Sequence, residues 1–93
     1  MRINRLIEGL IKDHDVSLET KEDGIKAFKE YDVFEKGKSG EYERYSLVDC
    51  LPRGTKFAVL IDEYSSYESG DCSWYFCIMI KYYDLYFSLH DRG

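Results

Sequence analysis

The sequence predicts an α+β fold in which an N-terminal amphipathic helix packs on an antiparallel sheet of about five strands. Apolar residues near the N-terminus recur at the spacing of one helix face. Residues 57–89 alternate with the two-residue period of strands, and short turn-forming runs separate the segments. A chain of 93 residues with 44% hydrophobic content is long enough for one domain, which we expect to span residues 1–93.

Residues 2–13 are predicted to form the helix. The positions i, i+3, i+4, i+7 and i+8 are all apolar and make one continuous stripe: Ile3, Leu6, Ile7, Leu10 and Ile11. A stripe of this kind can bind a partner, but it more often covers the core face of a sheet. We therefore expect this helix to be part of the core.

The next segment is ambiguous between strand and helix. Residues 16–19 alternate and predict a short strand. For residues 25–34, the Asp-Gly pair at 23–24 favours a hairpin followed by a strand, which we prefer. The same residues would form a helix if Thr20 were its N-cap and Asp23 completed a capping box.

Two further segments lead to the C-terminal half. Residues 36–40 (KGKSG) predict a flexible turn, and residues 41–48 (EYERYSLV) alternate again, which predicts another strand. A loop containing Pro52, the only proline, follows.

Residues 57–89 are predicted to form three consecutive antiparallel strands, a meander joined by two turns. In the first strand, alternation places Asp62 and Tyr64 on the face opposite Phe57. In the last, residues 85–90, apolar side chains alternate with polar or amphipathic ones. This pattern is typical of a sheet with one face in water.

The charge of the chain is acidic and unevenly distributed. The net charge is −5, and residues 57–93 carry six acids against two bases. An acidic domain repels phosphate backbones, so direct nucleic-acid binding is disfavoured and attraction to basic protein grooves is expected. The simpler interpretation is a charged surface that keeps the protein in solution. Neither a signal peptide nor an apolar run of membrane-spanning length is visible, so we expect a cytoplasmic protein.

No catalytic, cofactor or metal motif is expected. Three cysteines, Cys50, Cys72 and Cys77, are a poor basis for disulfides, and their spacing lacks a second pair of metal ligands. His14 and His90 each adjoin an aspartate, but neighbouring side chains point apart and do not orient an imidazole. We therefore expect surface histidines and a protein that is not an enzyme, with no cofactor and no metal.

Tyrosine is the more informative residue type. The chain has nine tyrosines, and Tyr64, Tyr75 and Tyr86 are predicted to lie outside the apolar core face. Exposed tyrosines are enriched in protein-binding surfaces, although cross-strand stacking on a wet sheet face would also account for them. Acids interleaved with these tyrosines favour a surface that docks a basic protein.

The first half of the chain carries a family resemblance. The stretches concerned are Ile3-Asn4-Arg5-Leu6-Ile7, Lys12-Asp13, Val16-Ser17-Leu18 and Gly40-Glu41-Tyr42. In them the chain resembles small phage-borne anti-CRISPR proteins that inhibit the type II effector nuclease. The resemblance implies a compact acidic domain whose carboxylates imitate DNA phosphates at the nuclease's PAM-reading site, with Asp13 and Glu41 matching acids in that role. The second half departs from it, because a tyrosine-rich meander stands where an acid-rich helical C-terminus would be.

Together these features predict a small acidic, non-catalytic inhibitor from a phage or mobile element that occludes the basic groove of a bacterial defence nuclease. The expected partner-binding residues are Asp13, Glu41, Asp62, Glu63, Tyr64, Tyr67, Glu68, Asp71, Tyr82 and Tyr83. The alternatives are an immunity protein that neutralises a nuclease toxin and, third, a small enzyme or small-molecule-binding domain. A tyrosine face could equally form a homodimer.

Overall fold

The computed structural model of the protein describes residues 15–92, and the helix predicted over residues 2–13 lies outside them. The elements in chain order are β1 (Asp15–Glu19), α2 (Lys21–Glu30), β2 (Val33–Glu35), the 3₁₀ helix η1 (Gly40–Arg44), α3 (Ser46–Asp49), β3 (Lys56–Ser66), β4 (Cys72–Tyr82) and β5 (Leu85–Arg92). No helix in this range is long and apolar enough to cross a membrane.

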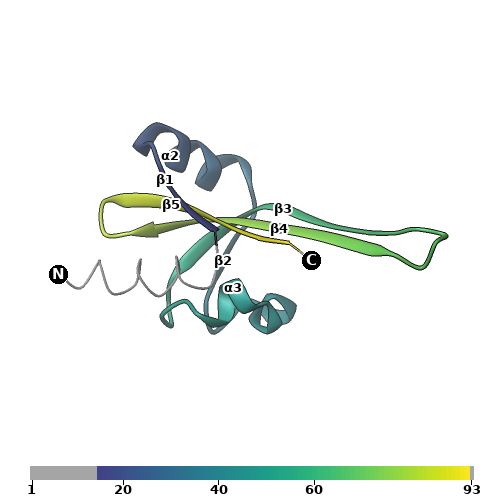
Figure 1. The fold of residues 1–93 in the computed structure, drawn as a ribbon. Helices are drawn as coiled ribbons and strands as arrows, with labels where there is room; N and C mark the ends of the chain where they lie inside the picture. Colours follow the sequence, from purple (N-terminus) through teal and green to yellow (C-terminus); the bar gives the residue numbers. More distant parts are fainter. Residues whose placement is uncertain (1–14, 93) are drawn as a thin grey trace.

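The strands form one five-stranded antiparallel sheet in the order β1-β5-β4-β3-β2 (Figure 1). β3, β4 and β5 are neighbours in sequence and in space, which confirms the three-stranded meander. The turns match the sequence as well. Gly70 has φ +89° between β3 and β4, and Tyr83 adopts φ +57° in the tight turn before β5.

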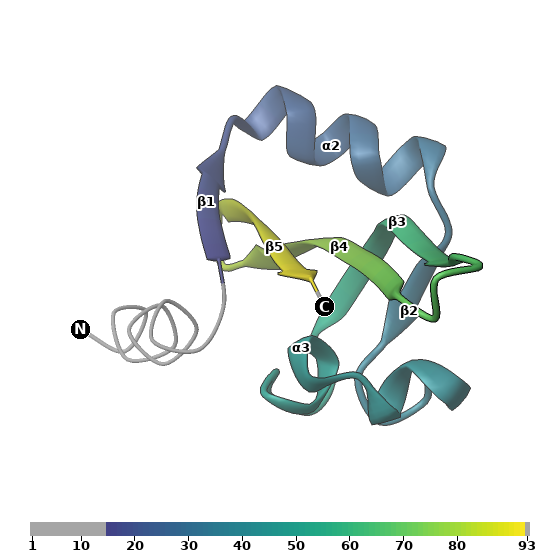
Figure 2. The same ribbon diagram turned by 45° about the vertical axis from the view of Figure 1, so that its right-hand side comes forward.

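Helical segments cover the sheet on both faces, α2 on one and η1 with α3 on the other (Figure 2). The larger core lies on the η1–α3 face and consists of Leu47, Val48, Leu51, Phe57, Phe76, Ile78, Ile80, Phe87 and Leu89. A smaller cluster under α2 consists of Ala27, Ala58, Met79 and Tyr86. The sequence predicted that this second face of the sheet is in water. The prediction is wrong where α2 covers the face, because Tyr86 is only 6% exposed under the helix.

The preferred assignment of residues 25–34 as a strand is wrong for residues 25–30, where the helical alternative is confirmed, and right only for residues 33–34, which belong to β2. α2 begins after Thr20, whose side-chain oxygen accepts a hydrogen bond from the backbone N–H of Asp23 at 3.1 Å. Gly24 lies within the helix instead of in a hairpin, and at this position the helix packs closely over Tyr86. A Cβ atom at Gly24 would lie 2.1–2.6 Å from ring atoms of Tyr86.

The predicted strand over residues 41–48 is also wrong. This segment forms η1 and α3, with Tyr45 between them. Tyr42, Tyr45 and Val48 recur every three residues, which is the repeat of a 3₁₀ helix, and all three contact the core. The alternation of a strand required a slip at Leu47–Val48, and both of these residues are fully buried.

Glu43 connects η1 to the preceding turn. Its carboxylate accepts hydrogen bonds from the backbone N–H of Gly37, at 3.0 and 3.1 Å, and of Ser39, at 3.2 Å, and from the Ser39 hydroxyl. The Nζ atom of Lys36 lies 3.7 Å from Glu43 and 3.8 Å from Asp49 of α3. These contacts hold the turn, η1 and α3 together.

β3 contains an irregularity that changes which side chains share a face. The register with β4 shifts between Val59 and Ile61, so that Leu60 is an extra residue on β3. Beyond this bulge, Asp62 and Tyr64 lie on the same face as Phe57. The sequence prediction placed them on the opposite face, because regular alternation contains no bulge.

Candidate partner-binding surface

The outer part of the β3–β4 hairpin projects from the body of the molecule (Figure 1). We call residues 62–74 the arm. All of them are exposed except Ser73, which is half-buried. The molecule measures 47 × 29 × 25 Å, and the arm lies along its long axis. The arm thus offers two strands and their connection to a partner with little cover from the rest of the described chain.

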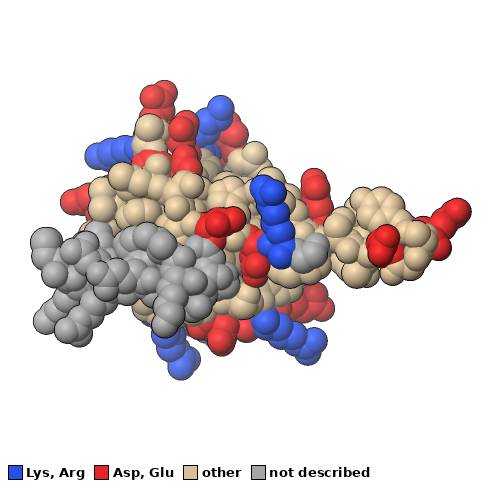
Figure 3. All heavy atoms as spheres, viewed as in Figure 1, with Lys and Arg blue, Asp and Glu red and all other residues tan. Residues whose placement is uncertain are grey.

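The arm is acidic and aromatic. It contains Asp62, Glu63, Glu68 and Asp71, and residues 57–80 contain no Lys or Arg. On the face drawn in Figure 3 its end carries acidic side chains. Tyr64 is 68% exposed and Tyr67 is 58% exposed. Such a surface combines negative charge with large, rigid side chains that contribute contact area at low entropic cost.

Hydrogen bonds shape the tip of the arm. The backbone N–H of Tyr67 donates to the carbonyl of Asp71 at 2.8 Å, and that of Gly70 donates to the carbonyl of Tyr67 at 3.0 Å. The hydroxyl of Ser69 donates to the Asp71 carboxylate at 3.1 Å. Glu68 and Asp71 are therefore presented on a closed turn.

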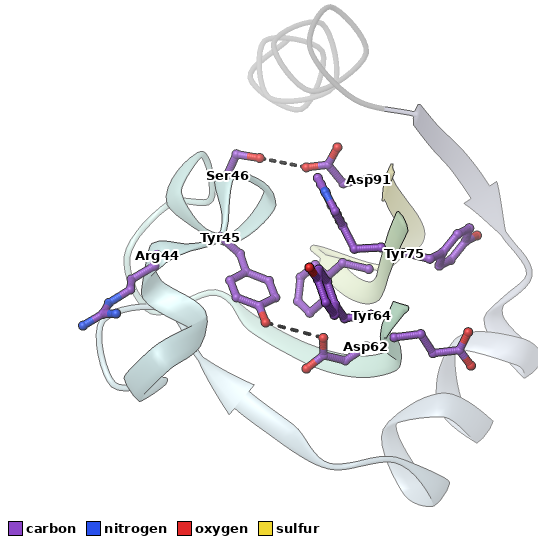
Figure 4. A pocket seen from close by; sticks show the side chains of 10 residues that line it. Arg44, Tyr45, Ser46, Asp62, Tyr64, Tyr75 and Asp91 are labelled. Atoms are coloured by element: carbon purple, nitrogen blue, oxygen red, sulfur yellow. Dashed lines mark hydrogen bonds between the residues drawn. The ribbon is translucent and has the colours of Figure 1, made fainter. Parts of the chain in front are cut away.

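A pocket of about 430 Å³ lies where the arm meets η1 and α3, and we call it the arm-base pocket (Figure 4). Its lining comes from η1–α3 (Arg44, Tyr45, Ser46), from β3 (Asp62, Glu63, Tyr64), from β4 (Trp74, Tyr75, Phe76) and from β5 (Asp91). Trp74, 38% exposed, pairs with Tyr64 across the hairpin and forms its outer side.

The floor of the pocket is a row of three residues across the sheet. Phe76 of β4 pairs with Asp62 of β3 on one side and with Asp91 of β5 on the other. The two carboxylates thus flank an aromatic ring, with Cα atoms about 10 Å apart, twice the spacing of neighbouring strands. The ring of Tyr45 meets Phe76 edge-on, with ring centroids 4.4 Å apart.

Both carboxylates accept hydrogen bonds from the η1–α3 side. The hydroxyls of Tyr42 and Tyr45 donate to Asp62, each over a long distance of 3.4 Å. The hydroxyl of Ser46 donates to Asp91 at 2.8 Å. Burial and the nearby Asp62 carboxylate raise the pKa of Tyr42 and of Tyr45 above the usual value.

Replacing Asp62 with Asn is expected to lower the pKa of Tyr45 toward its ordinary value, because the negative charge that opposes phenolate formation is removed. In the native protein the raised pKa contributes stability that is complete below the unfolded pKa of about 10 and is lost as pH rises through the folded value. Asp62→Asn should weaken this loss above pH 10. Ultraviolet titration of the tyrosines measures the pKa, and Glu63→Gln, on the opposite face, is the matched control. Equal changes in the tyrosine pKa for the two substitutions would contradict the conclusion that the Asp62 carboxylate lies close to the Tyr45 hydroxyl.

The structure brings together only part of the predicted partner-binding set. Asp62, Glu63 and Tyr64 lie at the base of the arm, and Tyr67, Glu68 and Asp71 lie at its tip. Tyr82 and Tyr83 are at the β4–β5 turn, at the other end of the molecule, where their rings contact each other (Figure 1). Glu41 is exposed on η1, and Asp13 lies outside the described residues.

Several lining residues were missed by sequence reasoning. Tyr45, Phe76 and Asp91 were not selected. For Asp91 a signal was present, because it continues the alternation of Phe87 and Leu89 and so shares their face. Nothing comparable marked Tyr45, whose role depends on the helical conformation of η1 and α3.

A second polar group lies on the α2 side of the sheet and links β1, β4 and β5. Ser88 donates to Glu19 at 2.8 Å, and His90 Nε2 lies 3.2 Å from the Ser88 hydroxyl. His90 Nδ1 is hydrogen-bonded to the hydroxyl of Tyr75. His90 is therefore half-buried in a network, in contrast to the expected surface histidine.

This network favours a structural role over nucleophilic chemistry. Ser88 is 4% exposed and its proton is directed to Glu19, away from the histidine. Cys77 lies 3.9 Å from His90 and is 2% exposed. Burial, together with the charge of Glu19, raises the pKa of the Cys77 thiol to about 11, so the reactive thiolate is scarce at neutral pH. Within residues 15–92 no three His, Cys, Asp or Glu side chains are grouped to hold a metal ion.

Comparison of the chain with models of protein families, with curated proteins and with solved structures gives no match. The arm, the arm-base pocket and the charge distribution are therefore the features that bear on function.

Proposed function

We propose that the protein is a non-catalytic inhibitor, encoded by a phage or mobile element, that binds a bacterial defence nuclease of the type II CRISPR class. It inserts the arm into the basic groove that otherwise holds nucleic acid, in the cytoplasm of the host. The observation that carries this proposal is the arm itself, a projecting hairpin with four acids and no Lys or Arg.

The physical basis is charge complementarity. A nuclease groove is lined by Lys and Arg that neutralise phosphates, and such a groove attracts an acidic segment from a distance. Recognition of the PAM also depends on arginine contacts, which carboxylates can occupy. From Asp62 to Ser66, where β3 ends, an extended strand covers roughly 13 Å at about 3.3 Å per residue, and the turn that follows adds to this reach, so the arm can enter a groove.

Aromatic side chains of the arm supply buried contacts that anchor the partner, which charge complementarity alone does not provide. Charge complementarity mainly increases the association rate and the specificity, whereas anchoring comes from buried aromatic contacts. Tyr64, Tyr67 and Trp74 are all exposed on the arm and available for such contacts. The arm therefore combines steering and anchoring in one segment.

The test is inhibition of DNA cleavage by a panel of purified, guide-loaded type II effector nucleases, with nuclease toxins of bacterial competition systems as a second panel. We expect one or more effectors to bind the protein and to lose PAM-duplex binding. The double substitution Glu68→Gln/Asp71→Asn should raise the dissociation constant at least tenfold, because close charge pairs at interfaces contribute about 1.5 kcal/mol or more.

The matched control is Glu22→Gln/Glu30→Gln, which removes the same charge from exposed positions of α2. This control should bind like the native protein. Inhibition of a toxin but of no effector would replace the proposal with an immunity function. Absence of inhibition in both panels, or equal losses for the two double variants, would contradict it.

A further inference from the structure

We infer that the arm-base pocket receives the side chain of an arginine from the protein partner. This inference rests on the proposed function in that it assumes a basic protein partner, and it specifies what that partner inserts at the base of the arm. The arm tip and the arm-base pocket would then make two separate contacts, one electrostatic and exposed, the other with a single enclosed side chain.

The two carboxylates of the pocket give it a negative charge that favours a cationic ligand. Asp62 and Asp91 flank its floor, and no Lys or Arg of residues 15–92 forms an ion pair with either. Arg44 lines the rim, but its guanidinium points away from the pocket in Figure 4. Arg92 stacks on Tyr75 on the opposite face of the sheet, 4.7 Å from the ring centroid. The two carboxylates thus face a space that the described chain leaves without a positive charge.

The walls favour a guanidinium. Phe76 forms the floor, Tyr45 the inner wall, and Tyr64 with Trp74 the outer wall. Aromatic faces attract cations, tryptophan most strongly, and a planar guanidinium can stack on a ring while it pairs with a carboxylate. A lysine ammonium is more strongly hydrated and lacks this planar fit. The walls and the carboxylates therefore suit arginine better than lysine.

The pocket is large enough for a partner's side chain, and its outer wall is exposed to solvent, so that the side chain can enter from outside. Its volume of about 430 Å³ lies within the usual range of ligand sites and exceeds what one side chain needs, so the aliphatic stem of the arginine can enter as well. Tyr64 and Trp74 are exposed in the free protein. Their rings would lose contact with water when the stem packs against them.

The hydrogen bonds at the rim leave acceptor capacity for the ligand. The Asp91 carboxylate accepts one hydrogen bond, of 2.8 Å, from the Ser46 hydroxyl. The Asp62 carboxylate accepts two long hydrogen bonds, of 3.4 Å each, from the hydroxyls of Tyr42 and Tyr45. A carboxylate offers about four acceptor sites, so each can accept further N–H donors. Tyrosine hydroxyls are neutral near pH 7, so Tyr42 and Tyr45 add no charge near the guanidinium.

The inference is tested by NMR titration of the isolated protein with N-acetyl-arginine amide, N-acetyl-citrulline amide and N-acetyl-lysine amide. Citrulline has the shape of arginine without its charge. We expect arginine to shift the indole N–H of Trp74 and the amides around Asp62 and Asp91, with binding at least fivefold tighter than lysine and no saturable shift with citrulline. Asp62→Asn and Asp91→Asn should each weaken binding about tenfold. Asp84→Asn, an exposed acid at the β4–β5 turn, should not.

The outcomes separate this inference from the proposed function. Binding of arginine in a protein that inhibits no nuclease would support the pocket and contradict the function. Inhibition of a nuclease without arginine-specific shifts would leave the function and overturn the pocket. Equal shifts with all three amides, or tighter binding of lysine, would also overturn it. Shifts at the same residues on raising the protein concentration alone would identify a second copy as the source of the cation and overturn the assignment to a partner.

Discussion

Replacing Gly24 with Ala is expected to destabilise the protein by about 1–3 kcal/mol, the usual effect of forcing extra atoms into a packed site. In an exposed helix the same change would stabilise by about 1 kcal/mol, because alanine has the higher helix propensity. Here the new Cβ atom would lie 2.1–2.6 Å from ring atoms of Tyr86. That ring is itself held by Phe28, whose centroid is 5.9 Å away. Urea unfolding followed by circular dichroism measures the effect.

The contact with Tyr86 can be isolated by a double-mutant cycle. When Tyr86 is first replaced with Ala, Gly24→Ala should become neutral or stabilising, because the ring that it meets is gone. Sucrose or sulfate in the buffer keeps this weakened background folded. Lys26→Ala, at an exposed position of α2, controls for helix propensity and should change stability by less than about 0.5 kcal/mol. Stabilisation by Gly24→Ala in the native background would contradict the close packing of α2 on the sheet.

Replacing Glu43 with Ala is expected to lower the free energy of unfolding by about 2 kcal/mol, in the range for hydrogen bonds to a charged group. The substitution leaves two backbone N–H groups and the Ser39 hydroxyl without their acceptor. It also removes one of the two carboxylates that lie near the Lys36 ammonium, and Asp49 remains as the other. Because η1 and α3 form one wall of the arm-base pocket, the same variant should alter the fluorescence of Trp74.

Two further substitutions separate the parts of this effect. Glu43→Gln keeps an acceptor without the charge and should lose less stability than Glu43→Ala. Glu41→Ala, at an exposed position of the same 3₁₀ helix, should be nearly neutral. If Glu41→Ala and Glu43→Ala cost the same, the carboxylate of Glu43 does not hold the turn.

The parts of the fold that could be predicted are those that depend on local pattern. Alternation and turn chemistry predicted the β3-β4-β5 meander, because each strand is long and turn-forming residues separate it from the next. The helix α2 was mistaken for a strand because Asp23-Gly24 is also a hairpin signal. The Thr20 cap marks the start of the helix, and Gly24 packs on Tyr86, a contact more than sixty residues away in sequence that local pattern does not reveal.

The arm-base pocket could not be predicted, because three features that alternation does not reveal create it. The extra residue Leu60 moves Asp62 to the face of Phe76. The helical conformation of residues 40–49 brings Tyr45 to that face. The pairing of β5 with β4 adds Asp91 from the end of the chain. The acids and tyrosines of the arm are exposed, as the sequence predicted. Sequence reasoning grouped them with Tyr82 and Tyr83, but the β3–β4 hairpin projects away from the β4–β5 turn, so the two groups lie at opposite ends of the molecule (Figure 1).

The central claim is that the acidic arm binds a basic groove in place of nucleic acid. It is tested most directly by the salt dependence of the dissociation constant for an inhibited nuclease, for the native protein and for Glu68→Gln/Asp71→Asn. We expect the affinity of the native protein to fall steeply as salt rises, and the slope of the logarithmic plot to be clearly smaller for the variant, because fewer charges are screened. An affinity that does not change with salt, or identical slopes for both proteins, would contradict the claim.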